Sequence, residues 1–491
     1  MLHLHRSERA DYLVEVLAEI LADPLEDPFA SEVVSVPTRG VERWLTQRLS
    51  HRLGGSPGRS DGVAANIEFP FPGSLVGAAV AAASGLDPRT DPWAPERAVW
   101  PLMEVVDDHL GDLFLKPLAE HLEASSPRGG DGVLVRFAAV RHVADLFDQY
   151  GVHRPALITS WARGERGEGL AERHLWQADL WRLLRERIGV ESPAERLDRA
   201  VARIAGEPNS VQVPARLSLF GLTRLPASYL LVLRALAETR DIHLLLLHPS
   251  GSLWKDLSEK LRELPIVRGG FLRSDDPTSG IPKNPLLRSW GRDAREMQLV
   301  LAAQGASAGE HRPVAGDRRN QVLHRLQSAI RANVAPPGEP AAGAADERPI
   351  LQGGDRSIQI HACHGRYRQV EVLRDAVLHL LSMDETLEPR DVIVMCPDVE
   401  TFAPLVQAVF AEERPSDSGD LGSPEMRVRL ADRSLRQTNP LLAVAAALLD
   451  LADGRLTASQ MLDFAGQEPV RRRFRFDDDE LSVLERWVIE M

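Results

Sequence analysis

With 491 residues, the chain is too long for a single hydrophobic core, so about two to four compact units are expected. Its content of 44% hydrophobic and 26% charged residues is typical of a globular protein, and no run of residues approaches the ~20 apolar positions of a membrane span. The net charge of −13 argues against a protein that coats nucleic acid non-specifically, although one basic groove can lie in an acidic shell.

The cysteine and lysine content adds two further constraints. Cys363 and Cys396 are too few for a four-ligand zinc site and are expected to be buried free thiols. Lysine is rare, so nearly all positive charge is arginine; this suits bidentate phosphate contacts, but a GC-rich genome produces the same bias. The N-terminal stretch MLHLHRSERAD lacks a signal-peptide pattern, which favours a cytoplasmic protein.

The chain is expected to open with a strand and a helix, as P-loop nucleotide-binding proteins do. Residues 2–4 predict the strand, Ser7 the N-cap, and the apolar spacing of residues 12–20 the helix. The loop between them, residues 5–9, has no glycine to wrap a phosphate and no lysine to reach it. No Gly-x-x-x-x-Gly-Lys motif occurs anywhere in the sequence, so an ATPase site is not expected.

A second strand, loop and helix span residues 33–50, VVSVPTRGVERWLTQRLS. The apolar β-branched start predicts a buried strand, Pro37 and Gly40 break it, and helical spacing follows. Thr38, Arg39 and Arg43 combine a hydroxyl and two guanidiniums with the N–H groups of a helix start, which together can hold a phosphate. An ordinary turn with solvated arginines explains the same pattern.

Helices dominate the next part of the chain, and an alternating pattern then returns. Helical spacing is found at residues 97–122, 133–150, 170–187 and 197–204, which indicates a helical insertion at about 95–205. Strands at 216–220 and 242–247 and helices at 228–237 and 286–302 follow. The second of these strands is apolar except for His243, as expected for a parallel strand that is covered on both faces.

A linker rich in Pro, Gly and Ala, residues 333–355, is expected to lead into a second alternating unit. The predicted strands of that unit are residues 358–362, 392–395 and 427–430. Its predicted helices are residues 370–381, 401–411, 440–451 and 477–491.

Residues that could carry catalysis are few. Asp477, Asp478, Asp479 and Glu480 suggest a metal cluster, but carboxylates at a helix N-terminus explain them better. Asp145 and Asp148 share a helical face and could act as paired carboxylates, yet no lysine or histidine cluster lies near them in the sequence. The sequence therefore predicts neither a catalytic residue nor a metal ligand.

Several blocks of the chain resemble the N-terminal region of the RecC family, which forms the gamma subunit of exodeoxyribonuclease V, the RecBCD helicase–nuclease. The first two are RGVERWLTQRLS and GVAANIEFPFPGSL. The others follow in the family's order: ADLFDQYGVHRP, LWQADLW, LFGLTRLPASYL, NPLLRSWGRDARE, HACHGRYRQVEVLRD and EPRDVIVMCPDVETFAPLVQAVF. The resemblance covers nearly the whole chain.

This resemblance implies an α/β fold of the inactive superfamily-1 helicase type, with P-loop-type parallel sheets. It implies a 1A-type domain over residues 1–345 with a helical 1B-type insertion at about 95–205, a linker at 333–355, and the start of a truncated 2A-type domain at 356–491. Because family members are more than twice as long, a fragment or an early-terminated reading frame is expected. No cofactor is expected in this chain, and ATP and Mg²⁺ belong to partner subunits.

The resemblance also implies a DNA path for the 3′-ended strand. Its residues here are Thr38, Arg39, Arg43, Asp145, Leu146, Asp148 and Arg154. The acidic residues and Arg154 match the family, whereas Pro37, Arg39 and Arg43 stand where small polar or amide side chains are expected in a reader of the Chi sequence. An arginine favours guanine or phosphate over adenine, so the Chi octamer itself does not carry over.

The function expected from the resemblance is a non-catalytic DNA-channel and scaffold subunit that acts in double-strand-break repair by homologous recombination. The implied partners are RecB-like and RecD-like subunits, double-stranded DNA ends and the 3′-ended single strand, with no membrane. Two alternatives are a protein-interaction scaffold, or a non-functional truncated fragment. A third, an ATP-driven helicase in its own right, is disfavoured by the missing phosphate loop.

Overall fold

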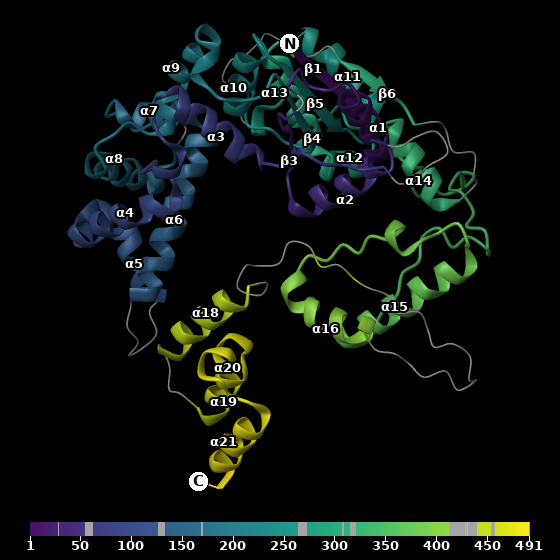
Figure 1. Ribbon diagram of the computed structural model, residues 1–491. Helices are drawn as coiled ribbons and strands as arrows, with labels where there is room; N and C mark the ends of the chain where they lie inside the picture. The colour runs from purple at the N-terminus through teal and green to yellow at the C-terminus, as the bar shows by residue number, and fades with distance from the viewer. Residues whose placement is uncertain are drawn as a thin grey trace. The chain divides into compact units, whose positions relative to one another are not determined.

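The computed structural model describes residues 1–27, 29–54, 62–125, 133–167, 170–263, 273–306, 309–314, 321–411, 428, 430, 439–452 and 457–490. The chain divides into two compact units, which are unit 1, Met1–Ile358, and unit 2, Gln359–Met491. Figure 1 shows the helices and strands of each.

Unit 1 is built on a six-stranded sheet in the order β3-β2-β4-β5-β1-β6, and each neighbouring pair is parallel. Its strands are β1 Leu2–Ser7, β2 Glu32–Ser35, β3 Ile67–Glu68, β4 Arg216–Leu222, β5 Asp241–Leu247 and β6 Glu310–Arg312. Because all the strands run in one direction, their carboxyl ends meet at one edge of the sheet.

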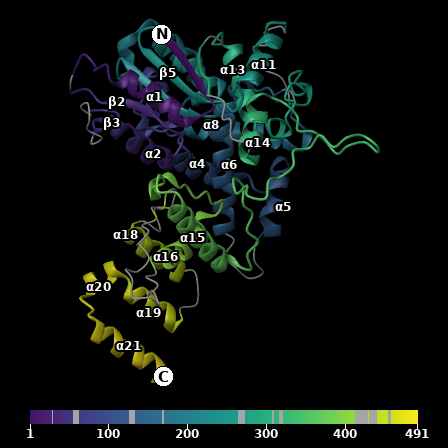
Figure 2. The ribbon, with the colours of Figure 1, turned by 90° about the vertical axis from the view of Figure 1, so that its right-hand side faces the viewer.

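The central strands are buried on both faces of the sheet. Successive residues of β5 alternate between two hydrophobic clusters, with Leu244 and Leu246 in one and Leu245 in the other. Leu219 and Phe220 of β4 divide in the same way. The leucine run of β5 therefore reflects helices on both sides, as the sequence predicts (Figure 2).

Each face of the sheet has its own set of helices. One cluster includes apolar residues of α1 (Ala10–Leu21) and α2 (Arg39–Ser50). The opposite cluster includes residues of α3 (Pro72–Ala83), α9 (Pro193–Gly206), α10 (Ala227–Ala237), α11 (Gly251–Glu263) and α13 (Arg292–Ala303). The remaining helices of this part are α12 (Pro285–Ser289) and α14 (Val322–Arg331).

The expected helical insertion is present and has its own core. Its helices before α9 are α4 (Pro95–His109), α5 (Lys116–Ser125), α6 (Val133–His153), α7 (Pro155–Ala162) and α8 (Trp176–Ile188). Trp161 and Trp181 are fully buried in this core, with ring centroids 6.2 Å apart, and Trp93 stacks on Trp181 at 5.7 Å. The long helix α9 also packs on α3 and α10, so it joins the insertion to the sheet.

Several predicted element bounds in unit 1 are wrong. The first strand extends to Ser7 because residues 5–7 pair with both β5 and β6, so this stretch is not a loop and Ser7 is not the N-cap of α1. The single helix predicted at 97–122 is two helices, separated near Gly111, a poor helix former. Gly291 likewise separates α12 from α13 within the helix predicted at 286–302.

The described part of unit 2 is helical. Its helices are α15 (Arg366–Met383), α16 (Val399–Ala411), α18 (Pro440–Ala452), α19 (Ala458–Gly466), α20 (Glu468–Phe474) and α21 (Asp478–Glu490). Asp477 Oδ1 accepts a hydrogen bond from Glu480 N at 2.8 Å, which confirms that the acidic run begins a helix. Together with one 3₁₀ turn, Pro389–Asp391, these elements make up the regular structure described for the unit.

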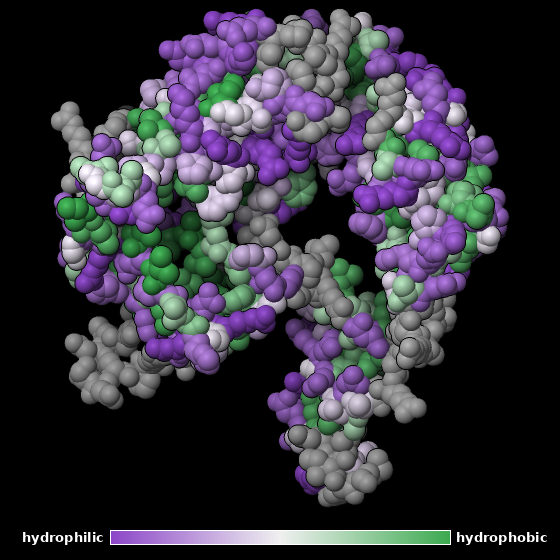
Figure 3. Space-filling view, turned by 180° about the vertical axis from the view of Figure 1, so that it is seen from behind, coloured by the Kyte–Doolittle hydropathy of each residue, from purple (hydrophilic) through white to green (hydrophobic). Residues whose placement is uncertain are grey.

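The strands predicted at 358–362 and 392–395 do not form among the described residues, and two of the four residues of the strand predicted at 427–430 lie outside them. Ile360 is 92% exposed and Met395 87% exposed, because no neighbouring strand pairs with these segments. The space-filling view in Figure 3 shows hydrophobic residues at the surface in green. Cys363 and Cys396 are free thiols as predicted, but they are partly exposed rather than buried.

The expected linker is irregular and exposed, but its first residue is fixed in place. Asn333 is buried, and its side-chain oxygen accepts a hydrogen bond from Lys283 N at 2.8 Å. Almost every residue from 334 to 354 is exposed, and none lies in a helix or strand. The assignment of 1A-type and 2A-type domains on either side of this linker stays a prediction. Among the described residues, no helix is long and apolar enough to cross a membrane.

Limited proteolysis tests this organisation. We expect the first cuts within residues 334–354, because little apolar surface is buried there, while residues 216–247 resist because they form the centre of the sheet. Mass spectrometry of the early fragments gives the cleavage sites. Early cleavage inside 216–247, with the linker intact, would contradict the boundary.

Candidate nucleic-acid interface

The turn from β2 to α2 lies at the carboxyl edge of the sheet. Val34 and Val36 are buried, whereas Pro37, Thr38 and Arg39 are exposed. Thr38 is the N-cap of α2, and its side-chain oxygen accepts a hydrogen bond from Val41 N at 3.2 Å. Its hydroxyl proton can still be donated. The structure thus places the predicted strand, loop and helix start where the sequence predicts them.

The two arginines of this turn are on the surface. Arg39 is ion-paired with Glu42, and its side chain is 59% exposed. Because exposed ion pairs contribute only about 0–1 kcal/mol, a phosphate can replace Glu42 at small cost. The guanidinium carbon of Arg39 also lies 5.2 Å from the ring centroid of Phe71, which follows β3. Arg43 lies about one turn further along α2 and is also exposed.

The predicted acidic residues lie near the C-terminal end of α6. Asp145 accepts a hydrogen bond from Arg141 Nε at 3.3 Å, and Leu146 is half-buried. Asp148 is an exposed residue, but neighbouring protein atoms partly desolvate its carboxyl and raise its pKa, and the negative charges of Asp145 and Glu96 raise it further. The two aspartates therefore interact unfavourably when both are ionised, as expected for carboxylates three residues apart on a helix.

The same end of α6 packs on the turn after β4. The hydroxyl of Ser228 in α10 donates a hydrogen bond to Val152 O at 2.6 Å. Burial and the positive charge of Arg224 both lower the pKa of His153. Arg154 is the N-cap residue of α7 and is exposed. A contact between the insertion and the sheet edge thus brings α6 next to the β4–α10 turn.

A cavity of about 430 Å³ lies between the insertion and helices α3 and α10. Phe71 and Asp148 both line it. Because Arg39 contacts Phe71, the β2–α2 turn (the arginine turn) and the face of α6 with Asp145 and Asp148 (the acidic helix face) adjoin the same cavity. Tyr229 of α10 lines it as well, and burial together with the charge of Asp148 raises the pKa of its phenol. Arg196 and Asp91 form a buried ion pair in the wall.

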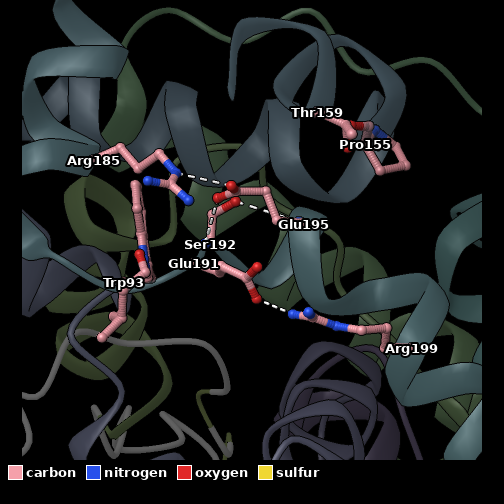
Figure 4. Close-up of polar contacts among 9 residues, drawn as sticks. Trp93, Pro155, Thr159, Arg185, Glu191, Ser192, Glu195 and Arg199 are labelled. Atoms are coloured by element: carbon pink, nitrogen blue, oxygen red, sulfur yellow. Dashed lines mark hydrogen bonds and ion pairs between the residues drawn. The ribbon is translucent and has the colours of Figure 1, made fainter. Parts of the chain in front are cut away.

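A polar frame in the insertion supports this wall (Figure 4). The hydroxyl of Ser192 accepts from Glu195 N at 3.4 Å, and Glu195 accepts in return from Ser192 N at 2.7 Å, which is a capping box at the start of α9. Arg185 Nε donates to Glu195 at 2.8 Å. Trp93 Nε1 donates to Val190 O at 3.0 Å, which fixes the indole beside the cavity.

The structure therefore brings part of the predicted set together. Asp148 lines the cavity, and Arg39 adjoins it through Phe71. Thr38, Arg43, Asp145 and Leu146 lie on the same elements but do not line it, and neither does Arg154, which precedes α7. Sequence reasoning missed Phe71, although an aromatic residue directly after a predicted strand could have indicated it. It also missed the buried Arg196, for which helical spacing gives no signal. DNA contact by any of these residues stays a prediction.

Comparison with protein families gives two matches. A family model described as "RecC, N-terminal domain" matches residues 2–333. A second, described as "RecBCD enzyme subunit RecC fourth domain", matches residues 438–491. The first match contains the whole sheet, the insertion and every predicted site residue.

Curated relatives resemble the chain along most of its length. The RecBCD enzyme subunit RecC of Mycobacterium tuberculosis is 44% identical over 493 aligned residues, which cover 100% of this chain and 43% of the relative. The subunit of the same name from Mycolicibacterium smegmatis is 43% identical, with 87% of this chain and 37% of the relative covered. That of Escherichia coli is 31% identical, with 87% and 40% covered. The chain thus spans less than half the length of these relatives.

The raised pKa of Asp148 leads to a prediction about stability. A carboxyl whose pKa is higher in the folded than in the unfolded state costs stability as pH rises from the unfolded value, near 3.8, through the folded value. The change Asp148→Asn should therefore raise the melting temperature at pH 7, by roughly 1–3 °C since the group is partly solvated. The gain should vanish below pH 3.8, where the wild-type carboxyl is also neutral.

Thermal unfolding followed by circular dichroism at several pH values measures this difference. Glu120→Gln is the control, because Glu120 is an exposed carboxylate, 66% accessible, on α5. It should leave the melting temperature unchanged. An Asp148→Asn protein that is no more stable than the wild type at pH 7 would show that the carboxylate is not disfavoured in the folded state.

Proposed function

The chain belongs to the RecC family, and from this premise we propose that it is a non-catalytic DNA-channel and scaffold subunit of a RecBCD-type exodeoxyribonuclease V. In this role it acts in double-strand-break repair by homologous recombination, with RecB-like and RecD-like subunits as partners. Those partners supply the ATP- and Mg²⁺-dependent chemistry. Its fold is a helicase-like α/β fold without an ATPase site.

This proposal rests mainly on one observation. The β2–α2 turn with Arg39 and the face of α6 with Asp148 adjoin the same cavity. Strands β2 and β4 are neighbours, and α2 and α10 belong to the clusters on opposite faces of the sheet. A parallel sheet opens a crevice at its carboxyl edge where successive connections leave on opposite faces. The β2–α2 turn, with Arg39, borders that crevice.

A single strand can be held there by two kinds of contact. Arg39, Arg43 and the first N–H groups of α2 suit phosphates, since a helix start and guanidiniums both attract negative charge. Phe71, beside the cavity, offers a ring on which a base can stack. We propose that the 3′-ended strand follows this path, and that the wall with Asp148 and Tyr229 provides recognition of a Chi-like sequence.

The alternative of a protein-interaction scaffold predicts no dependence of DNA binding on these residues. Replacing Arg39 or Arg43 by alanine should weaken DNA-end binding by the assembled complex several-fold, whatever the sequence, because a phosphate contact is lost. The slope of log K against log salt should fall by about 0.7–0.9 for each lost contact. Fluorescence anisotropy titrations at several salt concentrations measure both quantities.

The matched control is Arg163→Ala. Arg163 is also 59% exposed and paired with a nearby glutamate, Glu165, but it lies at the end of α7 and does not line the cavity. It should leave affinity and slope unchanged. Loss confined to one DNA sequence, with an unchanged slope, would mean that the arginines read bases. If the Arg39→Ala and Arg43→Ala proteins both assemble into the complex and bind DNA as the wild type does, the proposed DNA path is wrong.

A further inference from the structure

A second crevice of the same kind lies at the ends of β1 and β5. These strands are neighbours and end together, with Ser7 opposite Leu247. After β1 the chain enters α1 on one face of the sheet, and after β5 it enters α11, whose Trp254 packs on the other face. This is the position where sheets of this topology hold anionic ligands at a helix N-terminus.

In this protein a carboxylate of the chain itself occupies that position. Glu8 follows β1, and its side chain is only 7% exposed. Its Oε1 accepts a hydrogen bond at 3.2 Å from the backbone N of Gly251, the first residue of the 13-residue helix α11. His311 Nε2 lies 3.0 Å from the same oxygen. The carboxylate thus meets the positive end of a helix and an imidazole together.

The local sequence is adapted to this arrangement. A Cβ atom on Gly251 would lie 2.6 Å from the His311 ring and 3.0 Å from Glu8 Oε1, so only glycine lets both groups approach the helix. The neighbouring Ser250 is fully buried, and its hydroxyl accepts from Leu253 N at 3.0 Å. The first turn of α11 is therefore capped twice, once by a hydroxyl and once by the carboxylate.

The cation Arg6 interacts electrostatically with the Glu8 carboxylate, and neither group is fully hydrogen-bonded, since Glu8 Oε2 is buried without a partner. The guanidinium carbon of Arg6 lies 4.0 Å from the ring centroid of Trp254, and its Nε is buried without a partner. His248 is 5% exposed, and its Nε2 also lacks a partner. Burial lowers the pKa of His248 to about 3, and the positive charge of Arg6 adds to this effect. His248 is therefore a neutral polar neighbour, and Arg6 is the cation that balances the Glu8 carboxylate in this buried polar cluster.

We propose that the carboxylate of Glu8 is a built-in anion that fills the β1–β5 crevice in place of a phosphate group. The crevice is then closed to nucleotides by its own side chain, and removal of the carboxylate converts it into a site for a free oxyanion such as inorganic phosphate. This inference concerns the other end of the sheet edge and does not depend on the DNA path.

The test compares the wild-type chain with Glu8→Ala by thermal unfolding in sodium phosphate and in sodium chloride of equal ionic strength. In chloride the variant should melt about 3 °C or more below the wild type, because a helix-capping carboxylate is lost. Phosphate should restore part of this loss along a saturating curve, as a ligand that binds only the folded state does. The wild type should gain less from phosphate than Glu8→Ala, because any binding at the β2–α2 turn is common to both proteins.

Two further variants complete the experiment. Glu15→Ala removes a carboxylate of α1 that is paired with Arg52, and it should respond to phosphate as the wild type does. Glu8→Gln keeps the volume and one acceptor oxygen but removes the charge, so it should fold, melt below the wild type and gain no more from phosphate than the wild type does. It also covers the case in which Glu8→Ala does not fold.

Three results would overturn the proposal. One is Glu8→Gln as stable as the wild type, which would show that the charge is unnecessary. Another is a folded Glu8→Ala protein that gains no more from phosphate than the wild type. The third is a wild type that phosphate stabilises more than Glu8→Ala, because a crevice already filled by Glu8 has no room for the anion.

Discussion

The structure of unit 1 depends on the burial of its central strands on both faces. Because β4 and β5 are apolar on both sides, helices must cover both faces of the sheet. Because all the strands are parallel, every connection begins at the same carboxyl edge. Two of the crevices at that edge, where helices from neighbouring strands take opposite faces, lie between β2 and β4 and between β1 and β5. These two crevices contain different groups, which are exposed and charged in one and include a buried carboxylate in the other.

At the β2–β4 crevice the charged groups are exposed and can exchange partners. Arg39 holds Glu42 only by a surface ion pair, and the adjoining cavity has Phe71, Asp148 and Tyr229 in its wall. At the β1–β5 crevice Glu8 is buried against Gly251 N and His311. A sheet of this type can thus keep one crevice open to a ligand while its own side chain fills another, which fits the proposed role of a subunit that holds DNA and leaves ATP to its partners.

Local pattern predicted most of unit 1, because buried parallel strands and amphipathic helices have distinct apolar spacing. It failed where the structure depends on contacts between residues that are far apart in the sequence. Residues 5–7 look like a loop, yet pairing with both β5 and β6 makes them strand. The segments around Ile360 and Ile393 have strand composition but no partner strand in the described residues. Phe71 and Arg196 join the site through contacts between segments far apart in sequence, which spacing cannot show.

The most direct test of the account is hydrogen exchange in the chain assembled with RecB-like and RecD-like partners, with either a DNA end or a non-hydrolysable ATP analogue. DNA should slow exchange in residues 37–43 and 145–154, because these border the proposed path. The analogue should leave residues 5–9 and 248–254 unchanged, since in our proposal Glu8, bonded to Gly251 N, fills that crevice. Slower exchange at 5–9 with the analogue, or no effect of DNA on either segment, would contradict it.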